Sequence, residues 1–179
     1  MMKSTLSKPI SLTTADLTSR VGQTLGLSDW RVIEQADANA FGATTHDEQW
    51  IHTDPARAAH GPFGRTIAHG YLTLALATAL VDEVFEITDA VMVVNYGVDR
   101  VRFPAPLPVG AKVRAAVSLV GLRDFPGGVQ ATLHLEYQVA DQDKPCCVAD
   151  VLLRYYTQAE MATSSRPPTC RRESHRHSV

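Results

Sequence analysis

Strict alternation of apolar and polar residues is clearest in the C-terminal half of the chain. Between Val129 and Val139 every second residue is apolar and the residues between them are polar, an order typical of a β-strand with one buried and one solvated face. A second alternating run covers Ala111–Leu122. The turn residues Pro126–Gly128 separate the two runs and predict a β-hairpin. The runs Ala90–Phe103 and Cys146–Thr157 predict two further strands, and the short connections favour antiparallel pairing.

The N-terminal half has helical spacing instead. Apolar positions in Gln35–Thr45 recur with a helical period and predict a short helix. A short helix is also expected near Thr14–Leu17 and a strand at Ser28–Ile33. The segment His46–His69 is rich in turn residues and carries most of the polar groups suited to chemistry. This segment precedes Gly70–Phe85, whose pattern predicts one helix that is apolar on nearly every side. We therefore expect other parts of the protein to cover this helix all round.

A single apolar helix followed by antiparallel strands predicts an α+β fold in which the sheet curls around the helix. The chain has 179 residues, a length that suits one domain with a hydrophobic core. We expect this domain to cover residues 10–160. It would follow a flexible N-terminus at residues 1–9 and precede a disordered polar tail at residues 161–179, which contains Pro167-Pro168 and no apolar period.

Composition and charge exclude several classes of function. The net charge of −2 gives no reason to expect nucleic acid or a membrane surface as partner. The longest apolar stretch, Tyr71–Leu80, is too short to span a bilayer, and no secretory signal is visible, so we expect a cytoplasmic protein. The three cysteines form no C-x-x-C pair and are expected to be reduced thiols. Motifs for phosphate loops, dinucleotides, nucleophilic serine or zinc are absent from the sequence, so neither a nucleotide nor a metal is implied.

Asp47 and His52 are the strongest candidates for chemistry. They flank a short turn, and a carboxylate and an imidazole that share one water molecule can remove one proton and deliver another. The plainer alternative is that Asp47 caps a helix and His52 is an ordinary loop histidine. On spacing alone this alternative is favoured, because both residue types are common in loops.

The wider pattern resembles the signature of the MaoC-like (R)-specific enoyl-CoA hydratases. Asp47 and His52 are preceded by Phe41 and followed by Ala58 and then by Ala68–Gly70. The similarity covers roughly residues 28–156. It implies a hot-dog fold that uses no cofactor, and it assigns to Asp47 and His52 the activation of the water that adds to trans-2-enoyl-CoA. This assignment places the catalytic interpretation ahead of the plainer one.

The sequence departs from the usual family signature around this pair. The family has Gly before the aspartate and Asn-Pro after it, where this chain has His46, Gln49 and Trp50. The local sequence resembles that of the nodulation-protein-N-like subset of the family in the run Asp47-x-Gln49-Trp50-Ile51-His52. The differences leave the pair intact and put the choice of substrate in question.

Other residues are candidates for supporting roles, Gly70 and Gln49 by the same resemblance and the others by their positions. The backbone N–H of Gly70 would donate to the thioester oxyanion, and Gln49 would hydrogen-bond in place of the family's Asn. Thr78 faces the same side of the helix as Gly70 and could orient Asp47, although such a threonine more often bonds to its own helix. Arg102, or Arg100, could bind phosphates of the substrate, although arginines on strands are more often simply exposed to solvent. His69 is expected to be structural.

The predicted reaction is reversible syn hydration of trans-2-enoyl-CoA to (R)-3-hydroxyacyl-CoA. Three alternatives remain: a hot-dog acyl-CoA thioesterase, a dehydratase acting on acyl carrier protein, and a non-catalytic module that binds acyl thioesters. The thioesterase is disfavoured because the central helix carries no carboxylate before Asp82 and Glu83. Hot-dog subunits usually join sheets edge to edge, so a homodimer is expected.

Overall fold

One antiparallel sheet forms the body of the molecule. The computed structural model describes residues 8–157, so most of the predicted N-terminal segment and the whole predicted tail lie outside the described residues. Every pair of strands in this sheet is antiparallel. The strands follow the spatial order β2 (Gln23–Leu27), β6 (Lys112–Phe125), β7 (Gly128–Val139), β8 (Cys147–Thr157) and β5 (Ala90–Arg102), with β3 (Arg31–Val32) paired to β6. The four predicted strands and the hairpin between β6 and β7 are confirmed.

The core lies between the inner face of the sheet and two short helices, α4 (Gly70–Ala75) and α5 (Ala77–Asp82). The alternation of β6 and β7 fixes which side chains point inward, because successive residues of a strand face opposite sides. The buried inward set of these two strands comprises Val113, Ala115, Val117, Leu119, Ala131, Leu133, Leu135, Tyr137 and Val139. The predicted α+β hot-dog layout is therefore confirmed.

The central helix differs from its prediction in length. It is divided at Leu76, whose N–H bonds to the carbonyl of Thr73, three residues back, so the regular α-helical ladder is interrupted there. It also ends at Asp82, three residues before the predicted end. Phe85 instead begins β4 (Phe85–Ile87), which pairs in parallel with β1 (Ile10–Leu12). Strands of three residues are too short for their alternation to be visible in the sequence.

The prediction that protein covers the helix on nearly every side is wrong for the described residues. Thr73, Ala77 and Leu80 are buried against the sheet, but Tyr71 and Thr78 on the other side are exposed. The physical reason is that the chain supplies only one layer, the sheet, against these helices. The uncovered side of α4 and α5 is apolar apart from a few positions, as the sequence indicated.

The N-terminal elements follow the prediction in part. The short helix near Thr14 is a 3-10 helix at Asp16–Arg20, and only Arg31–Val32 of the expected strand at Ser28–Ile33 pairs with the sheet. The strand β2 was not predicted, because Gly26 interrupts its apolar pattern. In the structure, the register of β2 with β6 shifts between Thr24 and Gly26.

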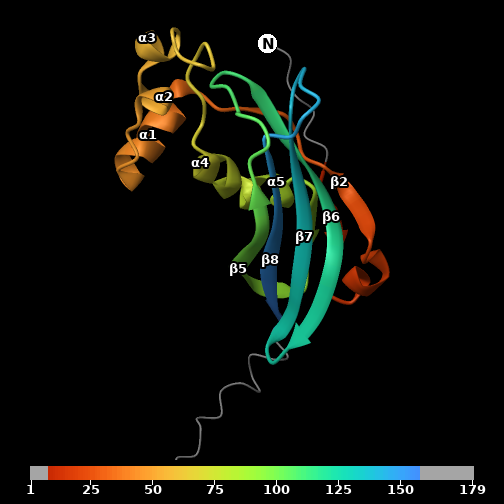
Figure 1. Ribbon diagram of the computed structural model, residues 1–179. Helices are drawn as coiled ribbons and strands as arrows, with labels where there is room; N and C mark the ends of the chain where they lie inside the picture. Colours follow the sequence, from red (N-terminus) through yellow and green to blue (C-terminus); the bar gives the residue numbers. More distant parts are fainter. Residues whose placement is uncertain (1–7, 158–179) are drawn as a thin grey trace, which may run out of the picture.

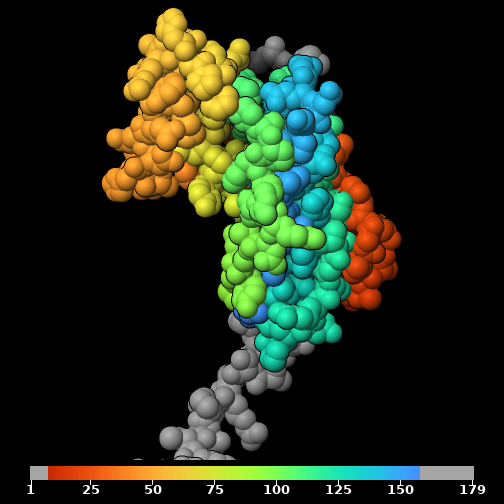
Figure 2. All heavy atoms as spheres, in the orientation of Figure 1, coloured from red at the N-terminus to blue at the C-terminus, as the bar shows by residue number. Residues whose placement is uncertain are grey.

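Three helices form a separate unit beside the sheet, which we call the overhang (residues 35–58). It contains α1 (Gln35–Thr45), which confirms the predicted helix with its bounds, together with α2 (Trp50–Thr53) and α3 (Pro55–Ala58). Figure 1 shows the overhang standing away from the sheet on the side of β5. In Figure 2 the same residues, orange to yellow, project from the body and leave a hollow beneath them.

The strand β5 closes one edge of the sheet and pairs only with β8 within the described part of the chain. Almost every side chain along it is exposed or half-buried. Many of these side chains are large and apolar: Val91, Met92, Val93, Val94, Tyr96 and Val98. No helix within residues 8–157 is long and apolar enough to cross a membrane.

Candidate active site

Asp47 lies just beyond the end of α1. Glu34 and Asp37 form a capping box that starts this helix, and His46 ends it in the left-handed conformation, with φ of 60°. This turn brings the chain back onto α1. Gly42 permits the close approach, because a Cβ at this position would lie 2.9 Å from the backbone oxygen of Asp47. The carboxylate of Asp47 is exposed.

His52 is held in one tautomer by the backbone. Its Nδ1 lies 2.7 Å from the carbonyl oxygen of Ile67, and a carbonyl can only accept, so Nδ1 carries the proton. The other nitrogen, Nε2, is then left with a lone pair that can accept a proton. The ring is 8% exposed, and this burial lowers the pKa of His52 below its ordinary value. The bond to Ile67 and the lowered pKa therefore both favour a neutral His52 whose Nε2 can accept a proton.

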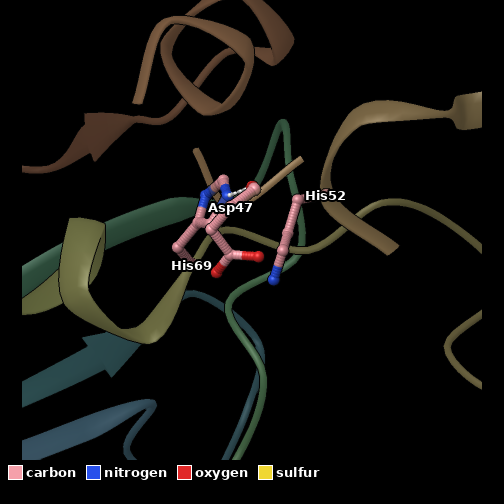
Figure 3. A group of neighbouring side chains, drawn as sticks. All are labelled: Asp47, His52 and His69. Carbon is pink, nitrogen blue, oxygen red and sulfur yellow. Dashed lines mark hydrogen bonds between the residues drawn. The ribbon is translucent and has the colours of Figure 1, made fainter. Parts of the chain in front are cut away.

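His69 links these two residues. Its Nε2 donates to the backbone oxygen of Asp47 at 2.9 Å, and its ring stacks on that of His52 with centroids 3.9 Å apart. The residue is only 2% exposed, and its Nδ1 has no hydrogen-bond partner within the described residues. Figure 3 shows the dashed bond from His69 to Asp47 and the carboxylate of Asp47 beside the ring of His52.

The three residues bring their polar side-chain atoms together. One ligand-type atom from each of Asp47, His52 and His69 lies within 4.8 Å of the others, a spacing that can hold a metal ion. The ring geometry suits a metal poorly, because the planes of the two imidazoles are only 25° apart. Lone pairs of nearly parallel stacked rings do not converge on one point. The arrangement fits a shared water between Asp47 and His52 better.

A cavity of about 360 Å³ opens beside His52. Gly70 is one of its lining residues and carries the first N–H of α4, a donor that has no partner inside its own helix. Cys146 also lines it, and burial raises the pKa of this thiol to about 12, so it is neutral and poorly suited to act as a nucleophile. The rest of the lining is mainly apolar: Phe63, Ile67, Ala68, Thr73, Phe103, Pro104, Ala105, Pro106 and Leu107.

Three predicted supporting residues have other contacts. Gln49 is exposed at the start of α2, where its backbone carbonyl accepts from Thr53. Thr78 hydrogen-bonds to Asn95 of β5, and both line a second cavity of about 240 Å³. Arg102 pairs in register with Val148 and donates to the carbonyl of Val101. None of Gln49, Thr78 and Arg102 lines the cavity beside His52.

Sequence reasoning did not indicate the contacts of two residues that support the site. His69 was expected to be structural, and it holds the backbone of Asp47 and stacks on His52. Its position directly before Gly70 was the available signal. Gln35 donates to the carbonyl of His52 at 2.7 Å and accepts from Thr66 at 2.6 Å, and nothing in the sequence indicated this role.

The fold is that of a hot-dog protein, in which Asp47, His52 and His69 lie close together. Comparison with known proteins identifies the class more closely. The MaoC like domain family matches residues 16–139, and the chain belongs to this family. It is a hydro-lyase, since its relatives in this family include a 3-hydroxyacyl-thioester dehydratase and an (R)-specific enoyl-CoA hydratase.

Two relatives and one solved structure illustrate the similarity. The chain is 49% identical to the 3-hydroxyacyl-thioester dehydratase Z of Mycobacterium tuberculosis over 142 residues, which are 79% of this chain and 94% of that protein. It is 39% identical to nodulation protein N of Rhizobium leguminosarum bv. viciae, over 78% of this chain and 88% of that one. The structure of the (R)-hydratase from A. caviae involved in PHA biosynthesis superposes with a TM-score of 0.62 and 26% identity, covering 75% of this chain and 96% of that one.

Proposed function

We propose that the protein catalyses reversible syn addition of water to a trans-2-enoyl-CoA, giving the (R)-3-hydroxyacyl-CoA. The observation that carries the proposal is the bond from His52 Nδ1 to Ile67, which leaves Nε2 free to act as a base beside the carboxylate of Asp47. The names of its relatives support the same chemistry, since one is a 3-hydroxyacyl-thioester dehydratase and another an (R)-hydratase.

The proposed reaction uses Asp47 and His52 as a pair. Both hold one water molecule, and the pair takes one proton as the water oxygen bonds to C3 of the substrate. The electrons of the C2=C3 bond move toward the thioester carbonyl, whose oxygen accepts a hydrogen bond from the Gly70 N–H. The pair then returns a proton to C2 on the same face, so that one water is added and the enzyme is restored.

The cavity beside His52 is the proposed site of the thioester. Its volume of about 360 Å³ lies within the range usual for small-molecule sites, and its lining is mainly apolar with few polar groups. Its wall includes both His52, which the reaction requires near C3, and Gly70, which it requires near the thioester oxygen. The pKa of Cys146 makes a covalent thiol route a poor alternative.

The test is the loss of enoyl absorbance with crotonyl-CoA. We expect turnover by the wild-type protein and its loss in the variants Asp47→Asn and His52→Ala, each checked for folding by circular dichroism. Crotonyl attached to acyl carrier protein, assayed in parallel, would show which carrier is preferred. Hydrolysis of the thioester without hydration would overturn the proposal in favour of a thioesterase. Binding without any reaction would favour a non-catalytic module.

We also propose that the protein acts as a homodimer joined along β5. This edge offers unpaired backbone groups and a row of exposed apolar side chains, of which Val93 is 53% exposed. An edge strand of this kind favours pairing with another strand. An antiparallel partner β5 would also lie under the overhang, beside the uncovered side of α4 and α5.

A further inference from the structure

The end of β5 contains an irregularity that determines where Phe103 lies. Asp99 pairs with Asp150 and Arg102 pairs with Val148, so β5 advances three residues where β8 advances two. One extra residue in a strand reverses the faces of all side chains that follow it. Without the bulge Phe103 would share the outer face of the sheet with Asp150.

Because of the bulge, Phe103 points to the inner face, toward α4. Its ring carbons lie 3.0 to 3.1 Å from the point that a Cβ on Gly70 would occupy. The ring therefore rests on the Cα of Gly70, next to the N–H assigned to the oxyanion. It also lines the cavity with His52 and is 43% exposed, so a ligand can reach it.

The bulge is anchored on the outer face of the sheet. Arg100 has a φ of 50°, a conformation uncommon for residues other than glycine. Its guanidinium forms a salt bridge with Asp150, with Nε 2.7 Å from Oδ2. Asp150 is 3% exposed and also accepts from His134 Nδ1 at 2.8 Å. This carboxylate is thus fixed from two sides and can hold Arg100 in its unusual conformation.

We propose that Phe103 is a specificity-determining residue that limits the size of the substituent on C2 of the substrate, and that Arg100 and Asp150 are positioning residues for it. The inference rests on the proposed function. A carbonyl oxygen bound at the Gly70 N–H places the thioester carbon and its neighbour C2 beside the Cα of Gly70. Phe103 occupies the space there, so a hydrogen on C2 fits and a methyl group is crowded.

The experiment compares two substrates, crotonyl-CoA and trans-2-methyl-2-butenoyl-CoA. In the variant Phe103→Ala we expect the ratio of kcat/KM for the branched substrate to that for the linear one to rise by about tenfold, the effect of one methylene-sized space in a pocket. The matched control is Phe63→Ala, since Phe63 lines the same cavity and is 45% exposed, whereas the three atoms nearest a Cβ on Gly70 all belong to Phe103. This control should change both substrates by a similar factor.

A second pair of variants tests the anchor. Asp150→Ala should shift the same ratio in the same direction, because Arg100 then loses the partner that holds its backbone. Adding Arg100→Gly to Asp150→Ala should restore the ratio, because glycine adopts a positive φ without an anchor.

Each failure has its own signature. An inactive wild-type protein with crotonyl-CoA would count against the proposed function. An active wild type with an unchanged ratio in Phe103→Ala would overturn the role of Phe103 alone. A ratio that Arg100→Gly does not restore in the Asp150→Ala background, while the melting temperature recovers, would overturn the role of the anchor.

Discussion

The sheet body and the overhang are held together in different ways. In the body, the inward side chains of β6 and β7 are almost completely buried, and Leu133 and Leu135 are 0% exposed. In the overhang, most of α1 is exposed, and the buried residues are Ala38 and Gly42 of α1, His52 of α2 and Ala58 of α3. Apolar burial is the dominant source of stability in globular proteins, so the body contributes most of the folding free energy.

The overhang is instead fixed by a few directional hydrogen bonds to the segment Thr66–His69. Ile67 accepts from His52, His69 donates to Asp47, and Thr66 donates to Gln35. This segment continues directly into α4, which packs on the sheet. Stability and the proposed chemistry therefore depend on different parts of the molecule, and residues 66–69 connect these parts.

The largest expected effects separate the two regions. Asp47→Asn should lower kcat/KM by about 10²- to 10⁴-fold, the usual contribution of general acid–base catalysis. Because Asp47 is exposed, the substitution should change the free energy of unfolding of the protein by no more than about 0.5 kcal/mol. Initial rates and urea unfolding of the same preparation measure the two quantities.

The counterpart in the body is Leu133→Ala. The cavity left by this fully buried side chain should lower the free energy of unfolding by about 2–5 kcal/mol. The kcat of the folded fraction should stay near that of the wild type, because Leu133 lies in the core of the sheet and does not line the cavity beside His52. A large loss of kcat in the folded protein would show that the regions are not separable in this way.

The same division explains how much could be predicted from the sequence. The strands of the body follow from alternation, because burial of one face imposes a period of two. The helix α1 and the pair Asp47 and His52 also followed from local pattern and family resemblance. The contacts of His52 with Ile67 and of Phe103 with Gly70 could not be predicted. They depend on a backbone carbonyl and on a bulge, neither of which requires a particular side-chain pattern.

The next effect concerns the connection through His69. His69→Phe keeps a ring of similar size against His52 but removes the donor to the Asp47 backbone. We expect kcat to fall by about 10²-fold with a smaller change in KM, because a displacement of about 1 Å in a catalytic group costs that much. The comparison variant is His69→Gln, whose side-chain amide can still donate at the position of Nε2. If the two variants are equally impaired, loss of the hydrogen bond is not the cause.

A smaller effect is expected at the edge of the body. Val93→Lys places a charge on the exposed strand β5, so that an interface between two β5 strands would contain one such charge from each subunit. Sedimentation analysis should give a dimer for the wild type and a shift toward the monomer for the variant, with a few-fold loss of activity. Val120→Lys serves as the control, since Val120 is 43% exposed on β6, away from this edge. A wild-type monomer at the assay concentration would contradict the proposed dimer.

The smallest effect is the response to pH. As the pH falls, His52 in the overhang should become protonated before Asp150 in the body. Burial lowers the pKa of His52 below its ordinary value of 6.5. The residue is therefore already neutral at pH 6.5 and becomes protonated only at a lower pH. The rate should therefore be flat above this pH and fall only below it, as Nε2 becomes protonated and can no longer accept a proton. Protons bind more readily to the unfolded state, so the stability that His52 contributes is present above pH 6.5 and is lost as the pH falls through its folded value.

In the body, burial alone would raise the pKa of Asp150, but hydrogen bonds from His134 and Arg100 outweigh this effect and hold the pKa below its ordinary value of 3.8. Its contribution to stability is present above that value and is lost only at lower pH, as the carboxylate itself becomes protonated. Between the ordinary pKa values of the two groups, 6.5 and 3.8, we therefore expect activity to decline while most of the melting temperature is retained. Parallel profiles of kcat/KM and of thermal unfolding measure this. If both fell together with one midpoint, the loss of activity would reflect unfolding rather than the titration of His52.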